Sequence, residues 1–267
     1  MSIGISNLAF KDYSFGKIIK FIEHSPISGI EIAPTLLWEK PISVSTKERN
    51  DINKIAVDHG LSIIGLQSLF YNQLDMQILG SPKSQKDCKE YLKHMIDLCA
   101  DIGGTILSFG SSHNRKRHKL QFIDAISMSA AFFSEMALYA KSAGVLICIE
   151  PVSSHYGCDF INTADEGAQL VYLVNDPNFR LMLDTGSMLL NEESCEDKIV
   201  KYSDIIAHMH INDPKLFPPS KKFNNHYHIA DKLRNTRYKG WLTMEFIQYY
   251  SKVEDDIAFG IKCYSGI

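Results

Sequence analysis

The sequence predicts a (β/α)₈ barrel, the TIM barrel fold, formed as a single α/β domain by residues 1–267. Short apolar or β-branched runs alternate with longer amphipathic segments along the whole chain, which is typical of βα units around a parallel sheet. Eight such units fit into the 267 residues, and this barrel needs that number at about that length. A doubly wound open sheet would usually have a glycine-rich turn after its first strand. The segment "SNLAFKDYSFG" has none, which favours the barrel.

Eight strands are expected where runs of five or six residues are mainly apolar or β-branched. They are Ile3–Asn7, Gly29–Ala33, Ser62–Gln67, Thr105–Phe109, Val145–Glu150, Arg180–Asp184, Ile205–His210 and Trp241–Phe246. The helices that follow are expected to begin near Ser14, Thr46, Gln85, Leu120, Thr163, Glu196, His226 and Glu254. Asn162 or Thr163 suits an N-cap, and Gly144 suits a helix end. The sixth and seventh helices are expected to be short, so the barrel should be distorted.

Composition limits the kinds of partner. The net charge is −3, with 28 basic and 31 acidic residues, which argues against a dedicated nucleic-acid binder. No apolar run approaches the roughly 18 residues of a membrane span, and the start "MSIGISNLAF" lacks the pattern of a signal peptide. The six cysteines form no C-x-x-C pair and are expected as reduced thiols. We therefore expect a soluble, cytoplasmic protein with a small-molecule ligand, and a homo-oligomer stays open.

Four of the expected strands end in a residue that can bind a metal ion. Strands five to eight end at or beside Glu150, Asp184, His210 and Glu245. Because side chains alternate along a strand, Glu150 faces the same way as Cys148, into the barrel, and the same count turns the other three inward. These strand ends meet at the C-terminal face of a barrel, where catalytic groups collect.

A bound cation gives this set a physical reason. Each residue alone would suit a solvated loop or a helix cap, but matching positions on consecutive strands need a common cause. Carboxylates that converge in a barrel mouth raise one another's pKa unless a cation holds them. Three carboxylates and one imidazole suit Mn²⁺, Mg²⁺ or Co²⁺ better than a thiolate-rich zinc site would. We predict one divalent metal ion, with Mn²⁺ as first choice and Zn²⁺ as a further alternative.

Five stretches resemble the sugar phosphate isomerase/epimerase family of xylose-isomerase-like TIM barrels. They are "GIEIAPTLLW" (29–38), "CIEPVSSHYGCDFI" (148–161), "LMLDTG" (181–186), "HMHINDP" (208–214) and "YKGWLTMEF" (238–246). The resemblance implies a single divalent metal held by Glu150, Asp184, His210 and Glu245, as in the ketose 3-epimerases of this family. It also implies that Glu150 and Glu245 act as catalytic acid and base on opposite faces of a sugar.

The chain departs from the ketose 3-epimerase pattern at three places. Ser187 stands where those enzymes carry a histidine three residues after the aspartate ligand, and Tyr156 stands where they carry a second glutamate. After the seventh strand, "PKLFPPSKKFNNHYH" replaces the usual arginine and Pro-Gly-x-Gly turn. These departures put the usual free-ketose substrate in question.

Other polar residues of the barrel mouth are candidates for contacts with the substrate. Glu31 lies at the end of the second strand and Gln67 ends the third, where each can bind a sugar hydroxyl, although a salt bridge is the alternative for Glu31. Tyr156 lies in the loop after the fifth strand. His208 faces the interior below His210, either as a hydrogen-bonded core histidine or as support for the metal ligand.

A basic loop, "GSSHNRKRHK" (110–119), follows the fourth strand. Such a run suits a solvated loop, but its place at the catalytic end predicts that Arg115, with His113, binds an anionic group such as a phosphate or carboxylate. Lys215, after the seventh strand, is expected to join them.

Together these features predict a metal-dependent isomerase or epimerase of a sugar or polyhydroxy acid, with or without a phosphate. Glu150 and Glu245 would transfer a proton through an enediolate, which the metal ion stabilises as a Lewis acid. A metal-assisted hydride shift is the rival mechanism and would need a second cation.

Two other functions stay open. A zinc phosphodiesterase like the apurinic endonucleases shares the barrel and the segment "HINDPK", but the third and fourth strands end in "LQS" and "SFGSSHNR" where a trinuclear zinc cluster needs histidines. A non-catalytic sugar-binding barrel would keep the fold without turnover.

Overall fold

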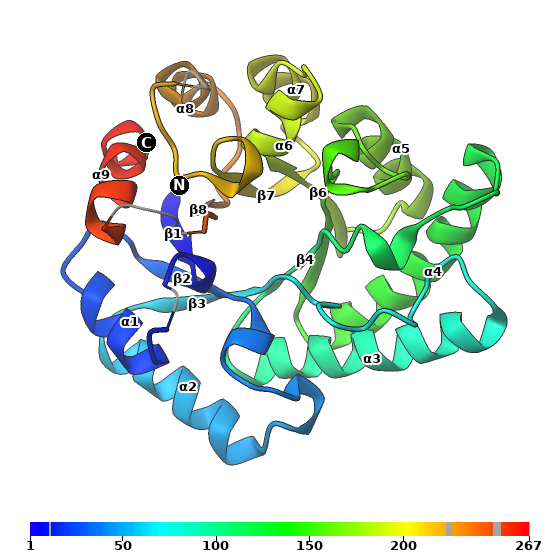
Figure 1. The fold of residues 1–267 in the computed structure, drawn as a ribbon, viewed down its shortest axis with the longest axis horizontal. Coiled ribbons are helices and arrows are strands. Elements are labelled where there is room, and N and C mark those ends of the chain that lie inside the picture. Colours follow the sequence, from blue (N-terminus) through cyan, green and yellow to red (C-terminus); the bar gives the residue numbers. More distant parts are fainter. Residues whose placement is uncertain (11, 223–225, 248–251, 267) are drawn as a thin grey trace.

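The computed structural model describes residues 1–10, 12–222, 226–247 and 252–266. Within these ranges eight parallel strands close into a barrel in chain order, and helices surround it (Figure 1). The strands are β1 (Ser2–Ser6), β2 (Gly29–Ile32), β3 (Ser62–Leu66), β4 (Ile106–Phe109), β5 (Leu146–Ile149), β6 (Phe179–Asp184), β7 (Ile206–Ile211) and β8 (Trp241–Met244). The pairing of β1 with β8 closes the ring. The predicted barrel is confirmed, and every strand end lies within two residues of its predicted position.

The α-helices form the outer ring of the barrel. They are α1 (Phe15–Ile22), α2 (Thr46–Asp58), α3 (Pro82–Asp101), α4 (Phe122–Ser142), α5 (Ala164–Val174), α6 (Thr185–Leu190), α7 (Cys195–Tyr202), α8 (His226–Arg234) and α9 (Val253–Tyr264). Each predicted helix start is confirmed to within three residues. The expectation of eight helices was wrong, because α6 begins directly after β6 and gives the described part of the chain a ninth.

Helix ends agree with their local chemistry. Thr163 caps α5 through a capping box, in which its hydroxyl accepts the Glu166 N–H and the Glu166 carboxylate accepts the Thr163 N–H. Gly144 follows α4 with φ +71°, a left-handed conformation that glycine adopts without strain. Thr163 thus marks the start of α5 and Gly144 the end of α4, as predicted.

The interior of the barrel fixes which side chains point inward. A small apolar cluster of Ile64, Ile106, Cys148 and Met182 fills the space inside the strands, while the larger core packs between strands and helices. Glu150 and Asp184 lie two positions after Cys148 and Met182 and therefore face the same side. The register pairs Asp184 directly with His210 across β6 and β7.

All six cysteines are buried and free, as predicted. Among the described residues, no helix combines the length and the apolar character that crossing a membrane would require.

Candidate metal centre

Glu150, Asp184, His210 and Glu245 meet at the C-terminal ends of β5 to β8. Each residue offers one ligand atom, and the four atoms lie within 4.8 Å of one another. Nδ1 of His210 is 3.0 Å from a carboxylate oxygen of Glu245 and 3.7 Å from one of Glu150. The structure thus brings together all four residues that the sequence indicated as metal ligands.

Asp184 is held by two hydrogen bonds that fix both carboxylate oxygens. Its Oδ1 accepts the backbone N–H of Ser187 at 2.6 Å, because Asp184 is also the N-cap of α6. Its Oδ2 accepts the side-chain amide of Asn212 at 2.7 Å. Asn212 was not among the predicted site residues, although it lies two residues after His210 and the period of a strand turns it to the same face.

Glu150 depends on a glycine in the neighbouring strand end. A Cβ atom at Gly110, directly after β4, would lie 1.9 Å from Oε2 of Glu150. Any other residue at position 110 would therefore displace the carboxylate. This glycine could not be selected from local sequence patterns, because the contact joins two strand ends that are forty residues apart in the chain.

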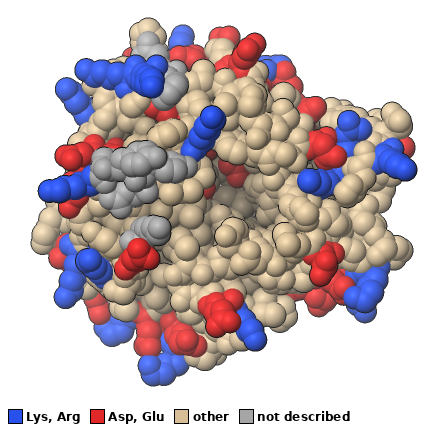
Figure 2. Space-filling view, in the orientation of Figure 1, with Lys and Arg blue, Asp and Glu red and all other residues tan. Residues whose placement is uncertain are grey.

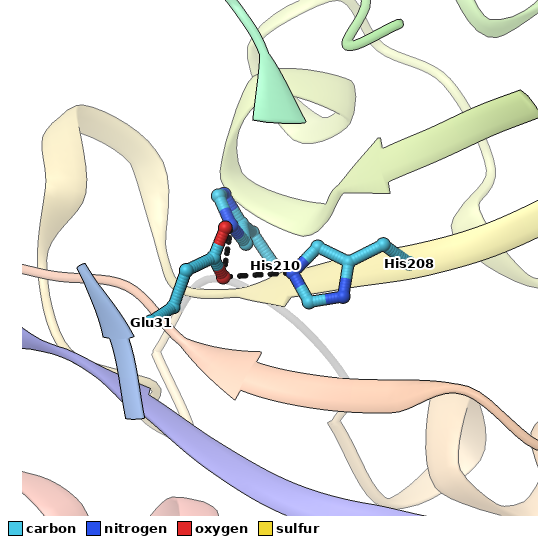
Figure 3. Close-up of side chains that lie close together, drawn as sticks. All are labelled: Glu31, His208 and His210. Carbon is cyan, nitrogen blue, oxygen red and sulfur yellow. Dashed lines mark hydrogen bonds and ion pairs between the residues drawn. The ribbon is translucent and has the colours of Figure 1, made fainter. Parts of the chain in front are cut away.

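A second layer lies directly below the four residues. Oε2 of Glu31 is 2.7 Å from Nε2 of His208 and 3.1 Å from Nε2 of His210, and Figure 3 shows both imidazoles turned toward this carboxylate. Its Oε1 accepts the hydroxyl of Ser108 at 2.7 Å. Glu31 has no exposed surface. The prediction that Glu31 contacts a substrate hydroxyl is therefore wrong, and the alternative, a buried ion pair, is found.

The layer explains the orientation of His210. With Nε2 donating to Glu31, Nδ1 is turned toward Glu245 and Glu150, where a neutral imidazole would offer its lone pair to a cation. This Nδ1 atom is buried and has no hydrogen-bond partner in the described structure. His208 is buried and hydrogen-bonded to Glu31, which fits both alternatives expected for it, a core histidine and a support for the metal ligand.

Burial and mutual repulsion raise the pKa values of two acids of the cluster, Asp184 and Glu245. Burial, together with the charges of Glu150 and Glu245, raises the pKa of Asp184 to about 7. Burial also raises the pKa of Glu245, against the opposing effect of His210. Burial of His210 favours its neutral form, but Glu245 and Glu31 outweigh it and hold the pKa of His210 well above the usual value. Protons on Asp184, Glu245 and His210 would thus offset the same charge repulsion that a cation removes.

The pKa of Glu31 shifts in the opposite direction. Burial alone would raise it, but the charges and hydrogen bonds of His208 and His210 prevail and hold the pKa of Glu31 well below its usual range. Glu31 is therefore a permanent carboxylate under the cluster.

These residues fit a divalent cation. An orphaned, buried imidazole nitrogen faces carboxylate oxygens whose repulsion a cation would remove, and oxygen-rich sets with one imidazole suit Mn²⁺, Mg²⁺ or Co²⁺. The donor set contains no thiolate, which would have favoured Zn²⁺.

The cluster lies at the floor of a cavity of about 360 Å³, here called the metal cavity. Figure 2 shows the hollow near the centre of the molecule, with acidic side chains inside it. Gln67 lines it, and its amide N–H donates to Ser6 while its Oε1 is buried without a partner. Tyr156 also lines it, and burial raises the pKa of Tyr156 to about 12, so its hydroxyl stays protonated. Gln67 and Tyr156 thus remain candidates for substrate contacts.

Arg115 has a structural role instead of the predicted one. It has no exposed surface and does not line the metal cavity. Its guanidinium donates to four backbone carbonyl oxygens, those of Phe109, Glu150, Phe160 and Ile161. The prediction that Arg115 binds a substrate anion is therefore wrong, because this side chain joins the loops after β4 and β5.

The other members of the predicted basic set are spread out. His113 lines the metal cavity, with one ring nitrogen 2.9 Å from the carbonyl oxygen of Leu74. Lys215 donates its backbone N–H to the Tyr156 hydroxyl, and its exposed side chain lies outside the residues that line the cavity. No arginine or lysine lines the metal cavity in the described part of the chain.

The family of the chain follows from a match over most of its length. The model of the xylose isomerase-like TIM barrel family matches residues 19–264. The chain belongs to this family. The resemblance predicted from five short stretches is confirmed, and xylose isomerase-like TIM barrels share the closed parallel barrel described above.

One relative of known activity is a D-psicose 3-epimerase of Agrobacterium fabrum. It is 31% identical to this chain over 123 residues, which is 46% of this chain and 42% of the relative. A D-psicose 3-epimerase of Ruminiclostridium cellulolyticum is 31% identical over 111 residues, 42% of this chain and 38% of that relative. The matches thus span less than half of these curated relatives.

Solved structures confirm the fold. A D-psicose 3-epimerase crystallised with D-fructose has a TM-score of 0.81, 20% identity, and coverage of 96% of this chain and 89% of that one. An AP endonuclease of family 2 from Brucella melitensis has a TM-score of 0.82, 15% identity, and coverage of 99% and 100%. At these identities the likeness shows the barrel alone, so the site must decide the function.

Proposed function

We propose that this xylose isomerase-like barrel is a divalent-metal-dependent sugar epimerase or isomerase that moves a proton between two glutamates. The observation that carries the proposal is the convergence of Glu150, Asp184, His210 and Glu245 within 4.8 Å at the mouth of the barrel. The D-psicose 3-epimerase relatives support an epimerase of sugars. Mn²⁺ is the expected metal, held by these four side chains.

When bound, the cation supplies Lewis-acid stabilisation to the oxygens of a keto sugar. Glu150 and Glu245 approach the metal cavity from β5 and β8, two strands that are not neighbours in the barrel. A sugar lying between them has a carboxylate on each face. One glutamate removes the proton alpha to the carbonyl, and the other returns a proton to the opposite face or to the neighbouring carbon.

The substrate's hydroxyls have partners in the same cavity. Gln67 lines the metal cavity, and its amide is the kind of group that binds a sugar hydroxyl. Tyr156 offers a hydroxyl that stays protonated at neutral pH. The cavity wall lacks arginine and lysine among the described residues, which favours a sugar without a phosphate or carboxylate.

The nuclease alternative finds less support. A trinuclear zinc site needs further histidines, and the described residues offer just one other cluster of potential ligands, Glu31 with His208 and His210. His226, another histidine near this end of the barrel sequence, is buried between Asp213 at 3.0 Å and the hydroxyl of Tyr264 at 2.8 Å. Its ring thus belongs to the contact between α8, α9 and the loop after β7.

Exchange with D₂O tests the proposal. Protein with one Mn²⁺ bound per chain is incubated with a panel of ketoses and aldoses, and the product is examined by NMR. We expect solvent deuterium at the carbon whose hydrogen moved, and a loss of turnover of about 10²- to 10⁴-fold in Glu150→Gln and Glu245→Gln. Metal occupancy is measured in each variant first. Product without deuterium, or no reaction of any sugar with fully loaded protein, would contradict the proposal.

A further inference from the structure

A second cavity opens directly from the metal cavity. It has a volume of about 690 Å³, nearly twice the 360 Å³ of the metal cavity. The two cavities share five lining residues, Ser68, Tyr71, Asn72, Leu216 and Glu245. Since Glu245 is one of the proposed catalytic glutamates, the second cavity begins at the reacting centre and extends away from it.

The wall of the second cavity combines apolar and hydrogen-bonding groups. Ile42 and Leu36 line it with 46% and 55% of their surfaces exposed, and the Tyr71 ring is 61% exposed. Tyr91, also in the wall, is 5% exposed, and its hydroxyl is buried with no hydrogen-bond partner. The Tyr71 ring beside these exposed aliphatic groups suits the apolar face of a sugar ring.

The charges of the wall favour an uncharged occupant. Glu39 and Lys40 line the second cavity with opposite charges, and no arginine lines it within the described ranges. An anionic group would also lie near Glu245. Buried anions need several charge-assisted donors, and this wall does not provide them.

We propose that the natural substrate is a keto sugar carrying a second, uncharged sugar ring. The reacting sugar occupies the metal cavity, and the second ring occupies the cavity bounded by Ile42, Tyr71 and Tyr91. This inference rests on the proposed epimerase function and assigns its substrate class.

A pair of matched substrates tests the assignment. Mn²⁺-loaded protein is incubated in D₂O with D-fructose and with reducing glucosylfructoses that differ in linkage position, isomaltulose among them. Deuterium incorporation gives kcat/KM, and isothermal titration gives the affinity for each sugar. We expect at least one glucosylfructose to exceed D-fructose by about tenfold or more in kcat/KM, because contacts with the second ring contribute binding energy.

Filling the second cavity should remove this advantage. Ile42→Trp adds bulk at a residue that lines the second cavity alone, so the glucosylfructose should lose about tenfold in kcat/KM while D-fructose stays unchanged. Leu36→Trp is a second variant of the same design, in case the first lowers the Tm. Val57→Trp, on an exposed surface of α2 outside both cavities, is the matched control and should change neither substrate.

The possible outcomes separate the two proposals. If D-fructose matches or exceeds every glucosylfructose, or if Ile42→Trp and Leu36→Trp lower both substrates by the same factor, the two-ring substrate is overturned and the epimerase stands. If no sugar exchanges deuterium although Mn²⁺ is bound, both proposals are overturned. A glucosylfructose preference that the filled cavity abolishes supports both.

Discussion

Removing the charge of Glu31 should weaken metal binding although Glu31 touches no metal-binding carboxylate. Its Oε2 accepts Nε2–H of His210, which orients the opposite nitrogen toward Glu245. Glu31→Gln keeps the size of the side chain but puts an amide where both His208 and His210 donate. Both N–H groups contact the same oxygen, Oε2, so the oxygen of the amide can still accept them, but His210 loses the charge that makes Nδ1 a strong ligand.

The expected loss follows from the way carboxylates support metal-binding histidines. Removing such a carboxylate costs about 10- to 100-fold in metal affinity, which is about 1.4–2.7 kcal/mol. A second effect opposes the first, because Glu31 helps to raise the pKa of His210 and so favours a proton that competes with the metal. The variant has less proton competition, so its deficit should be larger at pH 8 than at pH 6.

Isothermal titration with Mn²⁺ at both pH values measures this prediction. Glu193→Gln is the matched control, since Glu193 accepts the N–H of Ala164 and lies 3.7 Å from Nζ of Lys198, away from the cluster. Its Mn²⁺ affinity should equal that of the parent. An affinity of Glu31→Gln within twofold of the parent at pH 8, in folded protein, would refute the role assigned to Glu31.

Four further outcomes follow from the same contacts. Gly110→Ala puts a Cβ 1.9 Å from Oε2 of Glu150, so the carboxylate must move and turnover should fall by about a hundredfold. Because the pKa of Asp184 is raised to about 7, Mn²⁺ binding at pH 6 should release protons, seen by titration calorimetry in buffers of different ionisation enthalpy. In metal-free protein the raised pKa of Asp184 contributes stability that is fully present below pH 3.8 and is lost as the pH rises through about 7. Mn²⁺ should therefore raise the Tm more at pH 8 than at pH 5. Arg115→Met removes the four hydrogen bonds that the guanidinium donates to backbone carbonyls and should lower the free energy of unfolding by about 3 kcal/mol or more, measured by urea denaturation, and Arg115→Lys should not restore it.

A control variant accompanies the predictions on turnover, on proton release and on the free energy of unfolding. Gly16→Ala adds a Cβ where nothing lies within 4 Å, so it should leave metal affinity and turnover unchanged. Asp184→Asn should reduce the proton release, and an unchanged release would contradict the pKa assignment. Lys119→Met removes an exposed cation of the same loop and should leave the free energy of unfolding within about 0.5 kcal/mol of the parent. Equal losses in the variants of Lys119 and Arg115 would contradict the structural role of Arg115.

The fold could be predicted because local and global signals agree. Strand runs, helix caps such as Thr163 and helix ends such as Gly144 each report on neighbouring residues. The alternation of side chains along β5 to β8 then predicts which residues turn inward, and Glu150 with Asp184 follows from Cys148 and Met182. α6 escaped prediction because its six residues continue directly from β6 and are too few to show a helical period.

The site was harder to predict where it depends on contacts between distant segments. In "GSSHNRKRHK" the sequence cannot tell which cation is buried, since burial of Arg115 depends on carbonyls of the loop after β5. Glu31 contacts His208, which lies 177 positions later in the chain. An acid at the end of a strand has the same local sequence pattern whether its side chain faces the cavity or the layer below it. The register shift in β2 against β3, between Ile30 and Glu31, is also invisible in the sequence.

The second layer, which Glu31 and His208 form below the four clustered residues, bears on the choice between proton transfer and a hydride shift. A hydride shift of the two-metal kind needs a second set of ligands beside the first. Within the described ranges the other candidate set is Glu31, His208 and His210, but all three side chains lack exposed surface, and His210 already belongs to the first set. Glu31 is occupied by donors from both imidazoles and from Ser108. The second set therefore fits the support of the proposed single-metal site, and this arrangement favours the proposed proton transfer by Glu150 and Glu245 over a two-metal hydride shift.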